Sequence, residues 1–374
     1  MGCTPGEAYA CISITLNMRI AILANAFDET KGGAGRIAQV YADGLKDRGH
    51  EIVFWGPKPW FEKLSQASLI KRLYWHVSDI GVWSEMTKQI CAWKPDVLLT
   101  HNLTGCGFGT ASKIQQTGIR WVHVLHDVQL IEPSGKIMHG ESVSALRNLW
   151  RLTWSRLRQK SFGHPDKVVS PTNWLIDFHH SWKWFVADPA RVIPNPIDIK
   201  TSTHAKIPGR MMFVGRFELD KGFDVLLDAW NKVWRPGMEL ICIGDGSLRP
   251  SQDMQQQKQI TCVGWKTSDQ VVAYMAEAEA VIVPSRLIEN QPTVILEALS
   301  QRCHVIASNS GGIPETLAGC GQIVDLNQSD GFVRALFAFR DRVGLDERVS
   351  AESVLARHAL RTSLAQLEEI LREK

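Results

Sequence analysis

Two glutamates flank the start of a predicted helix. Glu289 precedes Pro292, and Glu297 follows it within an otherwise apolar run. Pro292 fits the first helical turn, where its missing N–H costs no hydrogen bond, so the amides of Thr293 and Val294 stay free to bind a phosphate. We predict that both glutamates contact a ligand at this helix start. The alternative is a salt-bridged structural carboxylate at Glu297 and a Glu289 that only favours the positive end of the helix.

Two cations, Arg216 and Lys221, lie in the segment Gly-Arg-Phe-Glu-Leu-Asp-Lys-Gly, directly after an apolar run. An arginine supplies a planar fork and a lysine a point charge, and together they suit a diphosphate with two or more negative charges. The sequence therefore predicts a diphosphate clamp, although the same pattern on its own also fits an ordinary solvated loop.

A glycine-rich segment, Lys-Gly-Gly-Ala-Gly-Arg-Ile-Ala over residues 31–38, contains the pattern G-x-G-x-x-A. A dinucleotide-binding turn needs its first glycine directly after a strand and an acidic residue after the next strand. Here several residues separate Ala24 from Gly33, and the next apolar run ends in Trp-Gly-Pro-Lys, so a nicotinamide cofactor is not expected. Gly33 can still approach an anion or a sugar closely; the alternative is a mobile loop without a ligand.

The elements that position these segments are short apolar runs separated by longer helical patterns, which is typical of parallel α/β sheets. The predicted strands cover 19–24, 51–55, 96–100, 120–125 and 167–170 in a first series, and 210–214, 239–243, 260–263, 280–283 and 304–307 in a second. We therefore predict an α/β fold of two Rossmann-like, doubly wound domains that face each other across a cleft. Ligands of such sheets bind at the carboxyl ends of the strands.

The length of 374 residues suits two domains, and the proline-rich run Val-Ile-Pro-Asn-Pro-Ile-Asp at 192–198 suggests a hinge between them. The first residues lack the basic start of a signal peptide, so we expect the fold to begin at Met18. The predicted boundaries are an N-terminal domain over 18–195, a linker over 196–209, a C-terminal domain over 210–345 and a helical segment over 346–374.

The order of the motifs along the chain resembles a known family. The two glutamates, the turn with Arg216 and Lys221, Ile-Gly-Asp-Gly at 243–246, Ser-Gly-Gly-Ile-Pro-Glu at 310–315 and Ile-Pro-Asn at 193–195 resemble the motifs of retaining glycosyltransferases of the GT-B fold, glycosyltransferase family four (glycosyl transferases group 1). The resemblance extends from Met18 to about Asp325. It implies that the C-terminal domain binds a nucleotide-diphosphate sugar and the N-terminal domain binds the acceptor.

The resemblance also implies individual roles. Glu289 would be catalytic near the reacting carbon, and His126 would reach the transferred sugar; the alternative for His126 is a strand-end histidine satisfied by the backbone. The donor would contact Gly33, Arg216, Lys221, Gly244, Gly246, Val263, Asn290, Thr293, Val294 and Glu297. Among these, the two cations would hold the diphosphate with the amides of Thr293 and Val294, Glu297 would accept hydrogen bonds from the ribose, and Gly244, Gly246 and Val263 would edge the base pocket. Asn290 departs from the glycine-rich start that many members have.

No metal ion and no cofactor are expected besides the donor. The chain has no Asp-x-Asp triplet, the metal-binding motif of the other main glycosyltransferase fold, so cations and helix dipoles must stabilise the leaving group. The eight cysteines form no C-x-x-C pair, which is typical of reduced thiols in a cytosol. The formal charge of +3 is too small to indicate a nucleic-acid partner.

Residues 146–160 predict an amphipathic helix with five basic residues and no acid. At about 100° per residue, one face carries Leu146, Leu149, Trp150 and Leu157, and the opposite face carries Arg147, Arg151 and Arg158. Two interpretations stay open. In both the leucine face is buried; in one the helix only packs on its sheet, and in the other the arginine face also contacts anionic lipid headgroups on the inner face of a membrane.

The leading prediction is a cytoplasmic, retaining glycosyltransferase that moves a sugar from a nucleotide-diphosphate sugar to a hydroxyl of a sugar or lipid-linked acceptor, in cell-envelope polysaccharide or glycolipid synthesis. Two alternatives are a nucleotide-sugar epimerase or hydrolase on the same scaffold and a catalytically silent nucleotide-sugar-binding subunit. The presence of Arg216, Lys221, Glu289 and Glu297 together argues against the silent subunit.

Overall fold

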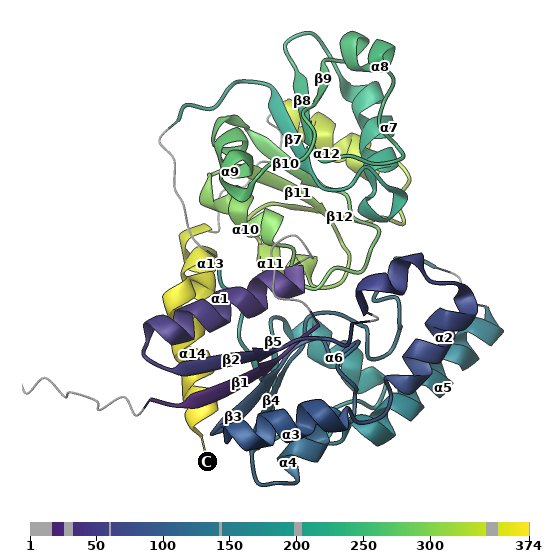
Figure 1. Cartoon of the computed structure of the whole chain (residues 1–374). Helices are drawn as coiled ribbons and strands as arrows, with labels where there is room; N and C mark the ends of the chain where they lie inside the picture. Colours follow the sequence, from purple (N-terminus) through teal and green to yellow (C-terminus); the bar gives the residue numbers. More distant parts are fainter. Residues whose placement is uncertain are drawn as a thin grey trace, which may run out of the picture.

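The computed structural model describes residues 17–25, 33–59, 61–141, 144–197, 204–341 and 351–373. It contains two α/β domains, each built on a parallel sheet of six strands (Figure 1). The predicted fold class is therefore confirmed. Central strands such as β3 (Val97–Thr100) and β10 (Ala280–Val283) are buried along their whole length, because helices cover both faces of a parallel sheet.

The first sheet has the strand order β2-β1-β3-β4-β5-β6. Its strands are β1 (Arg19–Leu23), β2 (Glu51–Trp55), β3, β4 (Arg120–Val124), β5 (Lys167–Ser170) and β6 (Ala190–Val192). The helices of this domain are α1 (Gly33–Asp47), η2 (Phe61–Gln66), α2 (Leu69–Ser78), α3 (Ser84–Trp93), α4 (Thr110–Gln115), α5 (Ala145–Phe162) and α6 (Asn173–Ser181).

The second sheet has the order β12-β11-β10-β7-β8-β9. Its strands are β7 (Arg210–Val214), β8 (Glu239–Ile243), β9 (Ile260–Cys262), β10, β11 (His304–Ser308) and β12 (Gln322–Val324). Its helices are η3 (Leu219–Lys221), α7 (Phe223–Val233), α8 (Gln252–Gln257), α9 (Ser268–Glu277), α10 (Thr293–Ser300), α11 (Ile313–Leu317) and α12 (Gly331–Arg340). In both sheets the order reverses beside the first strand, which places the binding edge at the carboxyl ends of the central strands.

Two short edge strands, β6 and β12, were not expected from the sequence. Each has three residues, and most of their side chains are exposed or only partly buried. Neither segment therefore shows the continuous apolar run that marks a central strand of a parallel sheet.

The C-terminal helices connect the two domains. Helix α13 (Ala351–His358) packs on the second domain through Val354 and Leu355, and α14 (Leu360–Arg372) packs on the first through Leu364, Leu367, Ile370 and Leu371 (Figure 1, yellow). Between them the chain meets the segment that joins the domains: the Ile197 amide donates to the His358 carbonyl at 2.9 Å, and Ser363 Oγ donates to the Pro194 carbonyl at 2.9 Å.

The predicted orientation of α5 is wrong. Arg151 and Arg158 are buried, whereas Leu146, Leu149, Trp150 and Leu157 are exposed. The structure stabilises the inward cations with specific partners: Arg151 Nε donates to Glu132 Oε2 at 2.5 Å, and the Arg158 guanidinium donates to the Gln129 carbonyl and lies 4.5 Å from the centre of the Phe108 ring. Both predicted interpretations of this helix had placed the leucine face inside.

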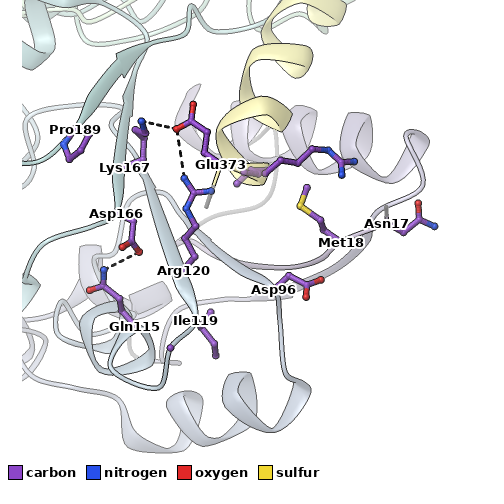
Figure 2. A pocket seen from close by; sticks show the side chains of 13 residues that line it. Asn17, Met18, Asp96, Gln115, Ile119, Arg120, Asp166, Lys167, Pro189 and Glu373 are labelled. Atoms are coloured by element: carbon purple, nitrogen blue, oxygen red, sulfur yellow. Dashed lines mark hydrogen bonds and ion pairs between the residues drawn. The ribbon is translucent and has the colours of Figure 1, made fainter. Parts of the chain in front are cut away.

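A cavity of 1110 Å³ lies at the amino ends of the strands of the first domain, beside the end of α14 (Figure 2). Glu373 lines this cavity, with Oε2 2.8 Å from Lys167 Nζ and 4.0 Å from Arg120 Nη2. Because this edge is opposite the carboxyl ends of the strands, the cavity is not the candidate active site. Within the described residues, we find no helix that combines the length and the apolarity that a membrane crossing requires.

Candidate active site

Glycines allow three loops of the second domain to meet at the carboxyl edge of its sheet. Gly244 follows β8 at φ 132°, and a Cβ atom there would lie 1.9 Å from the carbonyl oxygen of Gly215, which follows β7. The Gly244 amide donates to the Gly264 carbonyl at 3.0 Å, so the turn that begins at Val263 lies beside the loop after β8. A Cβ at Gly246 would lie 2.5 Å from the Phe217 carbonyl oxygen. The residues predicted to edge a base pocket are therefore neighbours.

Lys221 and Glu289 form an ion pair beside these loops. Lys221 Nζ lies 2.6 Å from Glu289 Oε1, and Ser285 Oγ donates to the same oxygen at 2.9 Å. Gly222 permits the approach, because a Cβ at its φ of 67° would lie 1.9 Å from the Pro284 carbonyl oxygen. The loop after β7 thus lies directly against the loop after β10, although the two ion-paired residues are 68 positions apart.

Arg216 pairs with a different carboxylate from the one that pairs with Lys221. Its guanidinium pairs with Asp220, whose other cationic contact is Lys136 of the first domain, at 3.0 Å. Partial burial acts to raise the pKa of Asp220, but the hydrogen bonds from Lys136 and Arg216 hold it below its ordinary value. Asp220 therefore stays ionised at neutral pH and connects the loop after β7 to the first domain.

The Ser-Gly-Gly motif supports the backbone that carries Glu289. The Gly312 amide donates to the Glu289 carbonyl at 2.7 Å. Cβ atoms at Gly311 and Gly312 would lie 2.1 and 2.0 Å from the carbonyl oxygens of Glu289 and Asn290, so only glycine fits at either position. The motif therefore acts on the site through the loop and does not itself supply a side chain.

Asn290 and Gln291 connect this loop to the rest of the molecule. Asn290 Nδ2 donates to the His126 carbonyl at 3.1 Å, and its Oδ1 accepts from Thr172 Oγ1 at 2.6 Å, so the side chain joins the two domains. Gln291 Oε1 accepts from the Asn195 amide at 2.6 Å. Asn290, which stands where many members have a glycine, and Gln291 thus fix the loop relative to the first domain and the hinge.

His126 follows β4 and lies in a histidine pair. Its Nε2 is 2.7 Å from His101 Nδ1, and the two rings stack with centroids 5.0 Å apart. Burial lowers the pKa of His126 to about 4 and lowers that of His101 well below the ordinary value. The His126 ring is therefore satisfied by another side chain, not by the backbone, and it is neutral at pH 7.

Acid is expected to destabilise the fold through His126. The folded-state pKa of about 4 lies below the unfolded value of 6.5, so the unfolded chain binds more protons between these pH values. His126 contributes fully to the free energy of unfolding above pH 6.5, and this contribution is lost as the pH falls through 4. Urea unfolding at pH 7.5 and pH 5 measures it: the loss of unfolding free energy on acidification should be smaller in His126→Gln than in the wild type. An equal or larger loss in the variant contradicts the assignment.

Glu297 faces the first domain across a cavity of 440 Å³. Its Oε1 lies 3.2 Å from Arg36, whose guanidinium also donates to Ser268 Oγ at 3.2 Å. Gly33, which begins the same helix α1, is exposed, and apart from its neighbours along the chain no atom of the described residues lies within 4 Å of the position of a Cβ there. Helix α1, which begins at Gly33, therefore lies opposite Glu297 across this interdomain cavity.

Helix α10 starts one residue later than expected. Pro292 is its N-cap, and Thr293 and Val294 are its first two residues. The first amide bonded within the helix is that of Ile295, which donates to the Pro292 carbonyl at 3.1 Å. The amides of Thr293 and Val294 belong to the helix start that has no intrahelical acceptor, as predicted for an anion site.

The structure thus arranges the predicted residues in neighbouring groups. Arg216, Lys221 and Glu289 lie together with the glycine turns, Asn290 joins Glu289 to His126, and Glu297 lies with Thr293 on the interdomain cavity. The partner side chains of these residues were not predicted from the sequence; they are Arg36, Lys136, Thr172, Asp220 and Ser285. Only Asp220 had a sequence signal, since it lies four residues after Arg216.

Known proteins match the chain along most of its length. Residues 31–201 match the family described as Glycosyltransferase Family 4, and residues 208–339 match the family described as Glycosyl transferases group 1. The structure of Anabaena HepE in complex with UDP superposes with a TM-score of 0.65 at 16% identity, covering 95% of this chain and 99% of that one. The chain is a glycosyltransferase of the GT-B fold.

Two relatives in sequence are also informative. An uncharacterized 42.6 kDa protein in the cps region of Klebsiella pneumoniae is 23% identical over 322 residues, which are 76% of this glycosyltransferase and 83% of that protein. The GDP-mannose-dependent alpha-(1-6)-phosphatidylinositol monomannoside mannosyltransferase of Mycobacterium tuberculosis is 31% identical over 170 residues, 41% of this chain and 44% of that one.

Proposed function

We propose that this glycosyltransferase is a retaining, metal-independent enzyme of family four that transfers a sugar from a nucleotide-diphosphate sugar to a hydroxyl of a sugar or lipid-linked acceptor. The observation that carries the proposal is the contact of Lys221 with Glu289, 2.6 Å apart at the carboxyl edge of the second sheet, with Arg216 on the same loop. A clamp for a leaving diphosphate and a carboxylate for the reacting sugar are adjacent there.

In this proposal the donor diphosphate displaces the carboxylates that now pair with the two cations. Asp220 pairs with Arg216, and Glu289 pairs with Lys221; each carboxylate supplies a single negative charge. A diphosphate offers more charge and more acceptor oxygens, and the free amides of Thr293 and Val294 add to its binding. The same groups stabilise the charge that develops on the leaving diphosphate, so no metal ion is required for that role.

Glu289, released from Lys221, is then free to stabilise positive charge at the reacting carbon. His126, neutral at pH 7, would hold the transferred sugar by a hydrogen bond and would not protonate the leaving group. Glu297 would give up its ion pair with Arg36 and accept hydrogen bonds from the ribose hydroxyls. The leaving diphosphate would take the acceptor proton on the face from which it departs, which retains the anomeric configuration.

The relatives support the donor and acceptor classes. The HepE structure holds UDP, and the mycobacterial relative is named for GDP-mannose and a phosphatidylinositol glycolipid. We propose that this enzyme acts in the cytoplasm, at the inner face of a membrane, in the synthesis of cell-envelope polysaccharide or glycolipid. The donor screen described next determines which nucleotide base and which sugar the enzyme uses.

A donor screen tests the proposal. Nucleotide sugars are first ranked by thermal shift, and the best donor is then incubated with sugar and lipid-linked acceptors, with and without a chelator. We expect a glycosylated product whose anomeric configuration, measured by NMR, matches the donor, at a rate that the chelator leaves unchanged. An inverted product or loss of activity with the chelator overturns the corresponding part of the proposal. Donor turnover that is equal without acceptor would instead identify a hydrolase or an epimerase.

A further inference from the structure

Exposed apolar side chains of the described residues are concentrated on two neighbouring helices of the first domain. Ten of the fifteen large exposed apolar side chains lie there, five on each helix. They are Leu69, Ile70, Leu73, Tyr74 and Val77 on α2, and Leu146, Leu149, Trp150, Leu152 and Leu157 on α5. Helix α2 has no buried residue at all. We call this surface the α2–α5 face.

The two helices form one continuous surface. His76 of α2 and Trp154 of α5 meet edge to face with ring centroids 6.2 Å apart, and the helices lie side by side at one end of the first domain (Figure 1). Between them lies a cavity of 620 Å³, lined by Leu73 and Trp150 and, on its inner side, by Thr104 and Gln129. The last two residues follow β3 and β4, so the cavity reaches the strand edge that carries His126.

The charged residues of the two helices are all basic. Neither α2 nor α5 contains an aspartate or a glutamate. Arg151 and Arg158 turn inward, but Lys71, Arg156 and Lys160 are exposed among the apolar side chains. On α5, Arg156 and Lys160 follow Leu149 and Leu152 at helical spacing, so leucines and cations share the outer face. Mixed apolar and basic side chains are typical of helices that lie in the interface of an anionic bilayer.

We propose that the α2–α5 face docks this glycosyltransferase on an anionic lipid bilayer, with the apolar side chains inserted and Lys71, Arg156 and Lys160 at the headgroups. The alternative occupant, a second copy of the chain, is disfavoured because face-to-face docking would bring together two surfaces whose helices carry only basic charges. Docking in this way would present the cavity between the helices to a lipid-linked acceptor. That last consequence rests on the proposed function, whereas bilayer binding does not.

Vesicle sedimentation without donor or acceptor tests the docking. Wild-type protein should sediment with vesicles of phosphatidylcholine and phosphatidylglycerol but not with phosphatidylcholine alone. The double variant Leu69→Glu/Ile70→Glu, and separately Leu149→Glu, should lower the partition coefficient at least tenfold. The triple variant Lys71→Gln/Arg156→Gln/Lys160→Gln should lose its response to the phosphatidylglycerol fraction. The matched control is Val186→Glu, which changes an apolar residue outside both helices that is as exposed as Leu149, and it should bind as the wild type does.

Three results would overturn the proposal: no wild-type binding to the anionic vesicles, an equal loss in Val186→Glu, or a dimer in light scattering that Leu69→Glu/Ile70→Glu dissociates. Nucleoside diphosphate binding and urea unfolding confirm that each variant is folded. Transfer to a water-soluble acceptor should be unchanged in the variants, so an absence of any transfer reports on the proposed function and not on docking.

Discussion

Replacing Glu289 by glutamine is expected to lower turnover by roughly 10² or more, the scale on which the loss of one charge-stabilising group affects catalysis. The substitution keeps the shape of the side chain and removes only its charge. Nucleoside diphosphate affinity should not fall, because Lys221, now 2.6 Å from Glu289 Oε1, loses a competing anion and becomes available to the diphosphate. Steady-state kinetics with the donor found by the screen and calorimetry with the nucleoside diphosphate measure the two effects.

Two companion variants sharpen the result for Glu289. Glu297→Gln should act in the opposite sense, weakening donor binding more than turnover, because Glu297 lies on the cleft with Arg36 and not beside Lys221. Glu239→Gln removes one charge from the start of β8, where Glu239 pairs with Arg210, and should change neither quantity. If Glu289→Gln abolished nucleotide binding and Glu297→Gln spared it, the two roles would be exchanged.

The sheets could be predicted from the sequence because buried parallel strands appear as short, continuous apolar runs. The runs at Val97–Thr100 and Ala280–Val283 are examples, and both are fully buried. β12, with the sequence Gln-Ile-Val and one buried residue, gives no such signal. Its place at the sheet edge follows from pairing with β11, which local sequence does not encode.

The loops of the site could be predicted, but their partners could not. Glycine turns and a helix start have local signatures, and Lys221 and Glu289 each belong to one. Arg36 and Glu297 are 261 residues apart, and their contact depends on how the two domains meet. The same holds for Thr172 and Asn290, which are 118 residues apart.

Helix α5 shows why an amphipathic pattern does not determine which face is buried. Arg151 and Arg158 are inside because Glu132 and the Gln129 carbonyl, in the loop before the helix, accept their hydrogen bonds and the Phe108 ring covers one guanidinium. Arg151 is paired with a carboxylate, which is how a buried charge is tolerated, whereas Arg158 has a carbonyl and an aromatic ring as its partners. The leucines are then left on the outside, where the docking proposal gives them a function.

Arg216→Ala or Lys221→Ala is expected to weaken nucleoside diphosphate binding by about 1.5 to 3 kcal/mol, or roughly 10- to 150-fold in Kd, which is the contribution of a charged hydrogen bond. Each cation has a carboxylate partner in the structure, Asp220 for Arg216 and Glu289 for Lys221, so part of its interaction with the diphosphate is offset by the partner it gives up. The upper half of the range is expected for Lys221→Ala, because this variant leaves the negative charge of Glu289 beside the bound phosphates without a neighbouring cation. The nucleoside monophosphate should be affected less than the diphosphate.

Lys232→Ala is the matched control. It removes a lysine that pairs with Asp228 on the exposed side of α7, and it should bind both nucleotides as the wild type does. Calorimetry with both nucleotides decides: equal losses for mono- and diphosphate would exclude the two residues from the diphosphate clamp and leave their ion pairs as structural contacts.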